Sequence, residues 1–155
     1  MKRVILIDRV HVFDPVSIGK SYSVMEEETD TRSTALTKVN LTKIRFKNML
    51  RSGEGYVAGE EKLRRLKSAG YIRLDEQVFC TLWENQSLIP KSWEKRTGVG
   101  ITYICFEGTL FESSHRGDGK FHALVLYWDG SKWCRTTLWL GNACYPSCMS
   151  AVLEK

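Results

Sequence analysis

The chain has 155 residues, of which 43% are hydrophobic and 26% are charged, and its net charge is +5. This balance excludes a disordered or low-complexity chain, and the length is sufficient for one domain, 1–155, with its own hydrophobic core. The amino-terminal apolar run from Val4 to Ile7 stops at Asp8, which is too short for a signal peptide, and no run reaches membrane-spanning length.

Residues 1–35 are expected to hold one strand and a mobile loop. RVILID is a short apolar run with β-branched residues, typical of a buried strand, and Asp14-Pro15 ends any continuation through VHVF. The polar stretch that follows predicts a long loop with at most one strand, around Tyr22 to Met25. The stretch MEEETD, Met25 to Asp30, is an acidic cluster that either lies on a loop or pairs with the basic segment across the fold.

Residues 36–97 form a basic part in which we expect helices. Between Arg32 and Arg73 there are eleven Lys or Arg and three acidic residues, a net charge of +8 that leaves −3 for the rest of the chain. Asn40 is a candidate cap for a helix over Leu41 to Leu50, which we favour. Read as a strand, the same stretch places alternate side chains on opposite faces: Lys43, Arg45 and Lys47 on one, and Thr42, Ile44 and Phe46 on the other.

Two later helices have clearer signals. GEEKLRRLKSAG begins with acidic residues, continues with basic ones and ends in glycine, and Leu63 and Leu66 mark its buried side. After the extended YIRLD, Asp75 is a candidate cap for EQVFCTLWEN, which carries an apolar stripe. PKSWEKR, with Pro90 in its first turn, is expected as a last short helix.

From Ile101 the sequence predicts an antiparallel sheet over 101–141. The runs ITYICF, TLFES, FHALVLYW and KWCRTTLWL are rich in β-branched and aromatic residues. Glu107-Gly108 and Asp129-Gly130 suit tight hairpins, and SHRGDGK is a looser connection. We expect an irregular tail after residue 141, with Val152 and Leu153 against the sheet. The predicted class is α+β: an amino-terminal strand region, a helical middle and a four-stranded antiparallel meander packed on helices.

The last predicted hairpin has two apolar faces. Strand alternation puts His122, Leu124, Leu126 and Trp128 on the face shared with Trp133, Arg135, Thr137 and Trp139. We favour burial of this face beneath the helices that carry Trp83 and Trp93, since aromatic stripes are usually core. The alternative is an exposed stacking platform for bases, sugars or a peptide, with Arg135 and His122 among the rings.

The basic region is the leading candidate for a functional surface. KLRRLKSAGYIRL resembles the recognition helix and first wing strand of winged-helix DNA-binding proteins, and that resemblance implies phosphate or groove contacts from Arg64, Arg65 and Lys67. Our first hypothesis is a small non-catalytic binding module in the cytoplasm that engages an acidic protein or nucleic acid. Its contacts are expected from two groups of residues: the basic Lys43, Arg45, Lys47, Arg64, Arg65, Lys67 and Arg73, and the Trp face with Trp128, Trp133, Arg135 and Trp139.

The five cysteines support a second hypothesis, a metal-dependent or cysteine-dependent enzyme. Their odd number and scattered positions predict reduced thiols. Cys144 and Cys148 with His122 or Cys134 are a conceivable metal set, but no second ligand pair follows, so we predict no metal or other cofactor. A catalytic thiol would be Cys105, Cys134 or Cys144 with His11, His115 or His122, against the alternative that strand cysteines are packing residues.

A longer resemblance runs through GEEKLRRLKSAGYIRLD, LWENQSLIPKSWEKRT, ITYICFEGT, VLYWDGSKW and PSCMSAVL. In this order the motifs resemble a family of small bacterial proteins of unknown function, over most of Leu36 to Leu153. The resemblance implies a bacterial protein that folds as one unit. It implies no functional residue, and the two tail cysteines depart from the family pattern. Separately, the apolar pattern of the Trp face is as consistent with a homo-oligomer that buries this face as with a monomer.

Overall fold

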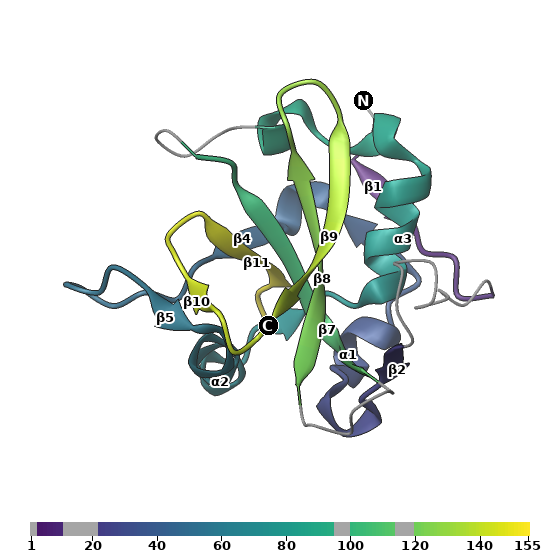
Figure 1. Cartoon of the computed structure of the whole chain (residues 1–155). Coiled ribbons are helices and arrows are strands. Elements are labelled where there is room, and N and C mark those ends of the chain that lie inside the picture. The colour runs from purple at the N-terminus through teal and green to yellow at the C-terminus, as the bar shows by residue number, and fades with distance from the viewer. Residues whose placement is uncertain (1–2, 11–21, 95–99, 114–119) are drawn as a thin grey trace.

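The computed structural model describes residues 3–10, 22–94, 100–113 and 120–155 (Figure 1). The strands are β1 (Val4–Leu6), β2 (Tyr22–Val24), β3 (Lys38–Asn40), β4 (Arg45–Lys47), β5 (Val57–Ala58), β6 (Ile72–Arg73), β7 (Tyr103–Ser113), β8 (Phe121–Trp128), β9 (Trp133–Trp139), β10 (Ala143–Cys144) and β11 (Cys148–Leu153). The α-helices are α1 (Thr31–Thr34), α2 (Gly59–Ala69) and α3 (Glu76–Glu84). The 3₁₀ helices are η2 (Glu26–Glu28), η3 (Leu41–Lys43), η4 (Gln86–Leu88) and η5 (Lys91–Glu94).

The fold is built on a mixed sheet of seven strands, so the predicted four-stranded antiparallel meander packed on helices is wrong. Strands β4, β11, β7, β8 and β9 lie side by side in this order, with β2 also paired to β7 and β6 to β11. Strand β11 runs parallel to β7 and antiparallel to β4. The hairpin of β8 and β9 is antiparallel with Trp128 opposite Trp133, as the Asp129-Gly130 turn predicts.

The carboxy-terminal tail is a central strand and not an irregular segment. Residues Cys148, Ser150, Ala151 and Val152 of β11 are buried, and they include residues from both faces of the strand. A strand buried on both faces lacks the alternation of apolar and polar residues by which strands are usually recognised. For this reason the sequence CMSAVL, with its small and polar residues, did not predict a strand between β4 and β7.

Glu107 and Gly108 lie inside strand β7, so the hairpin predicted there is wrong. The pairing of β7 with β8 shifts register between Phe106 and Phe111, which is the signature of a β-bulge. A Cβ added to Gly108 would lie 2.3 Å from the Arg73 carbonyl oxygen, so glycine is needed for close backbone approach. At the bulge, Glu107 and Thr109 therefore face opposite layers. Glu107 faces Lys62 of α2, and Thr109 accepts a hydrogen bond from the backbone amide of Glu76 in α3.

The helical middle is only partly correct. Helix α2 is confirmed, with Gly70 in the left-handed conformation at its end (φ 76°), and so is α3. The helix expected over Leu41 to Leu50 is wrong: the Asn40 side chain caps one turn, η3, and the chain then pairs with β11 as β4. Asp75 precedes α3 without capping it, because its carboxylate binds Arg9 and Ser33.

The amino-terminal part contains the predicted strand, but of the residues of β1 only Ile5 is buried, whereas Val4 and Leu6 are exposed. Strand β1 forms, but it pairs with β3 in a separate two-stranded sheet, and β2 lies within the range expected for a strand. The acidic cluster pairs across the fold, with Glu28 bound to Lys67 and Asp30 close to Arg73. His11, His115, most of SHRGDGK, the loop from Pro15 to residue 21 and the end of PKSWEKR lie outside the described residues.

The sheet has two covered faces, which Figure 1 shows between α3 on one side and α2 with β5 and β10 on the other. We call them the α3 face and the α2 face. The α3 face carries apolar residues packed on the helix, among them Ile104, Phe106, Leu124, Leu126 and Trp133 against Val78, Phe79 and Leu82. The α2 face carries Cys105, Glu107, Val125, Cys148 and Ser150. Within the described ranges no helix has the length and apolar character that crossing a bilayer requires.

Candidate functional site

The basic residues of α2 and β6 are engaged in ion pairs within the protein. Arg65 is buried and its Nη1 lies 2.6 Å from Glu54 Oε1. Arg64 pairs with Glu61, and Lys67 pairs with Glu28. Arg73 is buried and donates from Nη1 to the Glu107 carbonyl oxygen at 2.7 Å. Ion pairing inside the chain reduces the charge that these four side chains offer to an acidic partner.

The remaining predicted basic residues lie around β4. Lys43 and Arg45 are exposed, and Arg45 Nη1 donates to the Thr42 carbonyl oxygen at 3.0 Å. The Lys47 ammonium lies 5.4 Å from the centre of the Tyr71 ring. These three residues form a small basic edge at β4.

The Trp face is largely covered by helices, as the sequence favoured. Trp133 is buried and packs edge-on against the half-buried Trp128, with ring centres 5.4 Å apart. Arg135 lies over the Trp83 ring of α3 at 4.9 Å. Trp139 is exposed to 37% at the other end of the strand, with Lys120 over its ring. The rings therefore do not form one continuous stacking platform.

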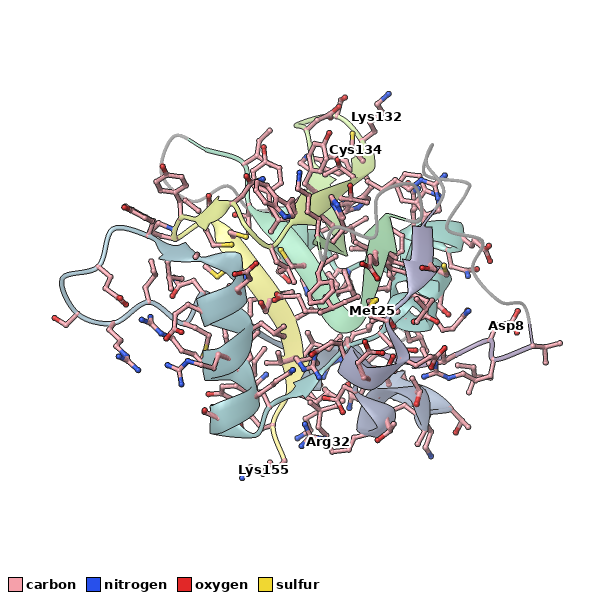
Figure 2. All side chains as sticks on the ribbon, turned by 60° about the horizontal axis from the view of Figure 1, so that its bottom comes forward. Asp8, Met25, Arg32, Lys132, Cys134 and Lys155 are labelled. Atoms are coloured by element: carbon pink, nitrogen blue, oxygen red, sulfur yellow. The ribbon has the colours of Figure 1, made fainter. Side chains whose placement is uncertain are left out.

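The five cysteines, all within the described residues, separate into two isolated thiols and one cluster. Figure 2 shows Cys134 beside Lys132 at the tip of the β8–β9 hairpin. Cys80 lies on α3, packed against the α3-face core. Cys105, Cys144 and Cys148, in contrast, meet on the α2 face. The Sγ atoms of Cys105 and Cys148 are 3.5 Å apart, and Cys144, also buried, packs in the same cluster.

A buried lysine completes the thiol cluster. Lys62 is 1% exposed and extends from α2 into the sheet, where its Nζ lies 3.7 Å from Cys148 Sγ and 3.4 Å from Glu107 Oε1. Burial by itself lowers the pKa of Lys62, but the negative charge of Glu107 and of the sulfur atoms outweighs it and leaves the pKa raised. Lys62 is therefore an ammonium, a donor and a positive charge, and not a nucleophilic amine.

Glu107 is the counter-charge of this lysine. Its Oε1 accepts from the Ser150 hydroxyl and faces Lys62, whereas its Oε2 is buried without a hydrogen-bond partner. A buried carboxylate oxygen with no donor costs free energy, and such groups concentrate at functional sites. The unsatisfied oxygen marks this part of the α2 face as more than a packing arrangement of thiols.

The electrostatics select one thiol of the cluster. Hydrogen bonds from Cys105 and Cys144, together with the nearby Lys62 ammonium, hold the pKa of Cys148 well below its usual value despite burial. The pKa values of Cys105 and Cys144 are raised, first because each donates to Cys148 and then because each is buried. Burial raises the pKa of Cys80 to about 12. The lowered pKa favours the thiolate form at Cys148 over the thiolate forms of Cys105 and Cys144.

The thiol cluster also adjoins a pocket. Cys148 lines a pocket of about 280 Å³ whose walls come from β7, β8, β9 and β10, with Tyr103 and Tyr145 as its exposed aromatic residues. The residue itself is 7% exposed, whereas Cys105 is fully buried. The pocket is slightly smaller than the roughly 300–1,000 Å³ typical of drug-sized ligands. It suits a small reactant.

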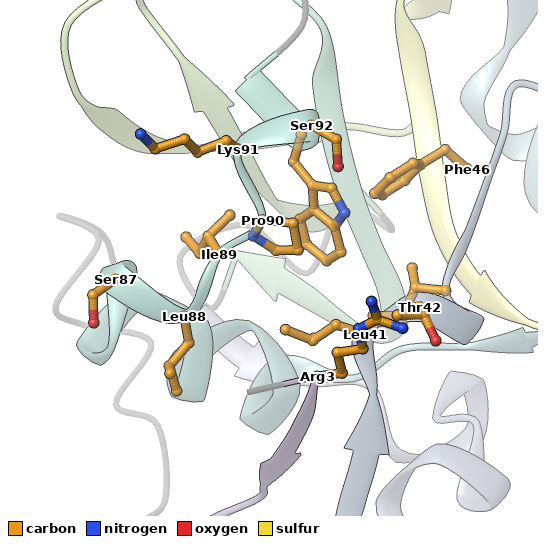
Figure 3. A pocket seen from close by; sticks show the side chains of 12 residues that line it. Arg3, Leu41, Thr42, Phe46, Ser87, Leu88, Ile89, Pro90, Lys91 and Ser92 are labelled. Carbon is orange, nitrogen blue, oxygen red and sulfur yellow. The ribbon is translucent and has the colours of Figure 1, made fainter. Parts of the chain in front are cut away.

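A larger pocket of about 880 Å³ lies near β4 and η5 (Figure 3). Thr42, Ile44 and Phe46 line it together, as the strand interpretation of this stretch predicted. Figure 3 shows Arg3 next to Thr42, while the Lys91 side chain extends away from them. Its described lining contains no cysteine, histidine or carboxylate, so it brings no reacting group of these kinds.

The metal set considered from the sequence does not assemble. Cys134 lies at the hairpin tip. His122 pairs with Trp139 and belongs to the α3 face of the sheet, whereas Cys148 belongs to the α2 face. Among the residues that the structure describes, no three His, Cys, Asp or Glu side chains are arranged to hold a metal ion. Of the predicted ligands only Cys144 and Cys148 meet, and their third neighbour is Cys105.

Sequence reasoning missed Lys62 and Glu107, although both carried a signal. Gly59, Lys62, Leu63 and Leu66 follow the i, i+3, i+4, i+7 spacing of a buried helix stripe, so a lysine occupies an apolar position. Glu107 is a carboxylate two residues after Cys105 and thus on the same strand face, but it was interpreted as a turn. Only the sheet topology brings the two residues together.

No family model, curated protein or solved structure matches the chain. The residues of the α2 face are therefore the basis for the function proposed below.

Proposed function

We propose that the protein is a cysteine-dependent enzyme in which Cys148 is the nucleophile and a small electrophile enters the pocket beside its sulfur. One observation carries the proposal: the Lys62 ammonium, 1% exposed, lies 3.7 Å from Cys148 Sγ at a pocket of about 280 Å³. The thiolate is the reactive form of cysteine, and a positive charge beside the sulfur favours it.

Each member of the cluster has a role in this proposal. Lys62 stabilises the negative sulfur, and Glu107 keeps Lys62 charged while Ser150 holds the carboxylate in place. Cys105 and Cys144 donate to the Cys148 sulfur. Lys62 and Glu107 act through Cys148, so they are positioning residues, and Cys148 alone contacts the electrophile.

The test is the rate at which each cysteine of the full chain reacts with iodoacetamide at about pH 6, followed by peptide mass spectrometry. A thiol with an ordinary pKa near 8.5 is almost entirely protonated at that pH. We expect Cys148 to be modified at least about tenfold faster than Cys134, the half-exposed thiol at the hairpin tip. Equal rates would contradict the proposal.

A matched pair of variants on α2 separates charge from accessibility. The double variant Lys62→Met with Glu107→Gln removes both buried charges at similar volume, and we expect the Cys148 rate to fall about tenfold or more. Lys67→Met removes a lysine of the same helix that pairs with Glu28 at the surface, and it should leave the rate unchanged. If both variants react like the unmodified chain, Lys62 does not hold a thiolate.

The binding module predicted from the basic region stays a prediction, as does the resemblance to a family of small bacterial proteins. The basic edge of Lys43, Arg45 and Lys47 is the part of that surface with the most available charge. A nucleic-acid titration at two salt concentrations tests it, because phosphate contacts weaken steeply with salt. Alkylation of Cys148 should not affect such binding.

A further inference from the structure

The two thiols around Cys148 point to a particular class of reactant. A thiolate that transfers an acyl group needs no second cysteine, whereas a thiolate oxidised to a sulfenic acid is commonly resolved by a neighbouring thiol. Here both neighbours adjoin the nucleophilic sulfur: Cys105 Sγ lies 3.5 Å from it, and Cys144 packs in the same buried cluster. The pocket of about 280 Å³ admits small oxidants and limits large ones.

We propose that the Cys148 site reduces a small hydroperoxide and that Cys144 is the resolving thiol; this inference rests on the function proposed above. In the first step the Cys148 thiolate attacks the terminal peroxide oxygen. The S–O bond forms, the O–O bond breaks, and Cys148 becomes a sulfenic acid. The leaving alkoxide or hydroxide takes a proton from water in the pocket, so the peroxide gains two electrons and sulfur loses two.

In the second step the Cys144 sulfur attacks the sulfur of the sulfenic acid. The S–S bond forms and the S–O bond breaks, and the departing hydroxide combines with the Cys144 proton as water. The product is a disulfide between Cys144 and Cys148. Return to the thiol state requires an external thiol reductant acting by thiol–disulfide exchange.

Strand geometry favours Cys144 over Cys105 as the partner. In the parallel pair of β7 and β11, Cys105 is opposite Ser150, so Cys148 is its diagonal neighbour two residues away. Diagonal neighbours have Cα atoms about 7 to 8 Å apart, and a disulfide rarely spans more than about 7 Å. Both strands lie inside the sheet and cannot approach each other without disturbing it.

The backbone at Cys144 is less constrained than that of the central strands β7 and β11. Cys144 ends the short strand β10, which among the described strands pairs with β5 alone, and a turn leads from it to Cys148. The Cys148 amide donates to the Tyr145 carbonyl oxygen at 2.9 Å within this turn. A turn at the margin of the fold adjusts at lower cost than two central strands, so the sulfur of Cys144 is the one that can close the bond.

The experiment treats the reduced full chain with one equivalent of hydrogen peroxide and maps the cysteines by peptide mass spectrometry, with and without dimedone, which traps sulfenic acids. We expect a Cys144–Cys148 disulfide in the unmodified chain. In the Cys144→Ser variant we expect a dimedone adduct on Cys148 in its place. In the Cys80→Ala variant, a control that removes a thiol of α3 outside the cluster, the Cys144–Cys148 disulfide should still form.

Other outcomes overturn the inference in distinguishable ways. A Cys105–Cys148 disulfide, or a persistent sulfenic acid in the unmodified chain, overturns the role of Cys144. If iodoacetamide modifies Cys148 rapidly but peroxide leaves it unchanged, hydroperoxides are the wrong class of reactant and the proposed function stands. If neither reagent reacts faster at Cys148 than at Cys134, both the inference and the proposed function are overturned.

Discussion

The two faces of the central sheet are buried to a similar extent but differ in chemistry. On the α3 face, Phe106, Leu124 and Leu126 pack on Phe79 and Leu82, and all five side chains are 0% exposed. On the α2 face, Lys62 and Glu107 are each 1% exposed and adjoin three thiols. Alternate residues of the same strands therefore build an ordinary core on one side and a charged cluster on the other.

This difference indicates which face of the sheet is the better candidate for function. Burial of an ion pair is expensive, and replacement by apolar residues of similar volume is often neutral or stabilising. The α3 face shows that this chain can build an apolar core from the same strands. A lysine and a carboxylate retained on the α2 face, with one carboxylate oxygen unsatisfied, are best explained by the sulfur that they adjoin.

The largest effect is expected from removing one charge of the α2 face. Lys62→Met keeps a similar side-chain volume but leaves the Glu107 carboxylate and the Cys148 sulfur without their positive neighbour, so we expect a loss of about 3 to 5 kcal/mol in the free energy of unfolding. Urea denaturation measures it. The double variant Lys62→Met with Glu107→Leu should recover most of this loss, and a cost below about 1 kcal/mol for Lys62→Met would contradict a buried ion pair.

A core deletion on the α3 face should reduce stability without changing the thiol. Leu82 is 0% exposed, and Leu82→Ala is expected to cost about 2 to 5 kcal/mol through lost burial and the cavity that remains. The iodoacetamide rate of Cys148, measured where the variant is folded, should equal that of the unmodified chain. A slower rate would mean that the two faces are coupled.

The pH dependence of stability should differ between the two faces. Because the pKa of Cys148 is lowered in the folded state, its stabilising contribution is complete above the unfolded pKa of about 8.5 and is lost as the pH falls. The difference in unfolding free energy between the unmodified chain and Cys148→Ala should therefore grow by about 1.4 kcal/mol per pH unit from about pH 6 to about pH 8. Urea denaturation at several pH values measures it, with Cys80→Ala as the control.

For the control Cys80→Ala, the thiol's contribution to stability depends on pH in the opposite direction. Burial raises the pKa of Cys80 to about 12, so its contribution is complete below the unfolded pKa and is lost only as the pH rises above about 8.5. The difference for Cys80→Ala should thus be constant from about pH 6 to about pH 8. If the unfolding free-energy difference for Cys80→Ala changes with pH as steeply as that for Cys148→Ala, the thiol cluster is not the source of the pH dependence.

The smallest effect is expected at the edge of the α3 face. Arg135 lies 4.9 Å from the centre of the Trp83 ring, and Arg135→Gln should cost about 0.5 to 1 kcal/mol through loss of this cation–π contact. Urea denaturation followed by tryptophan fluorescence detects it. The Arg135→Gln, Trp83→Leu double variant should show no additional loss from Arg135, and full additivity would contradict the contact.

Local signals in the sequence predicted α2, α3 and the β8–β9 hairpin, because helix stripes, glycine at a helix end and an Asp-Gly turn act over a few residues. They failed at β11 and Gly108, where burial on both faces and a β-bulge depend on neighbours far along the chain. The same difference between local and long-range signals applies to the candidate site. Cys144 and Cys148 were candidates by residue type, whereas Lys62 and Glu107 needed the topology that brings α2 over β7.

The most direct test of a single thiolate on the α2 face is the ultraviolet absorbance of thiolate, titrated in the unmodified chain and in Cys148→Ala. The account predicts that the difference between the two stays constant, at one thiolate per chain, from about pH 6 to about pH 8. A difference that is absent at pH 6 and rises with a midpoint near 8.5 would identify Cys148 as an ordinary thiol and contradict the account.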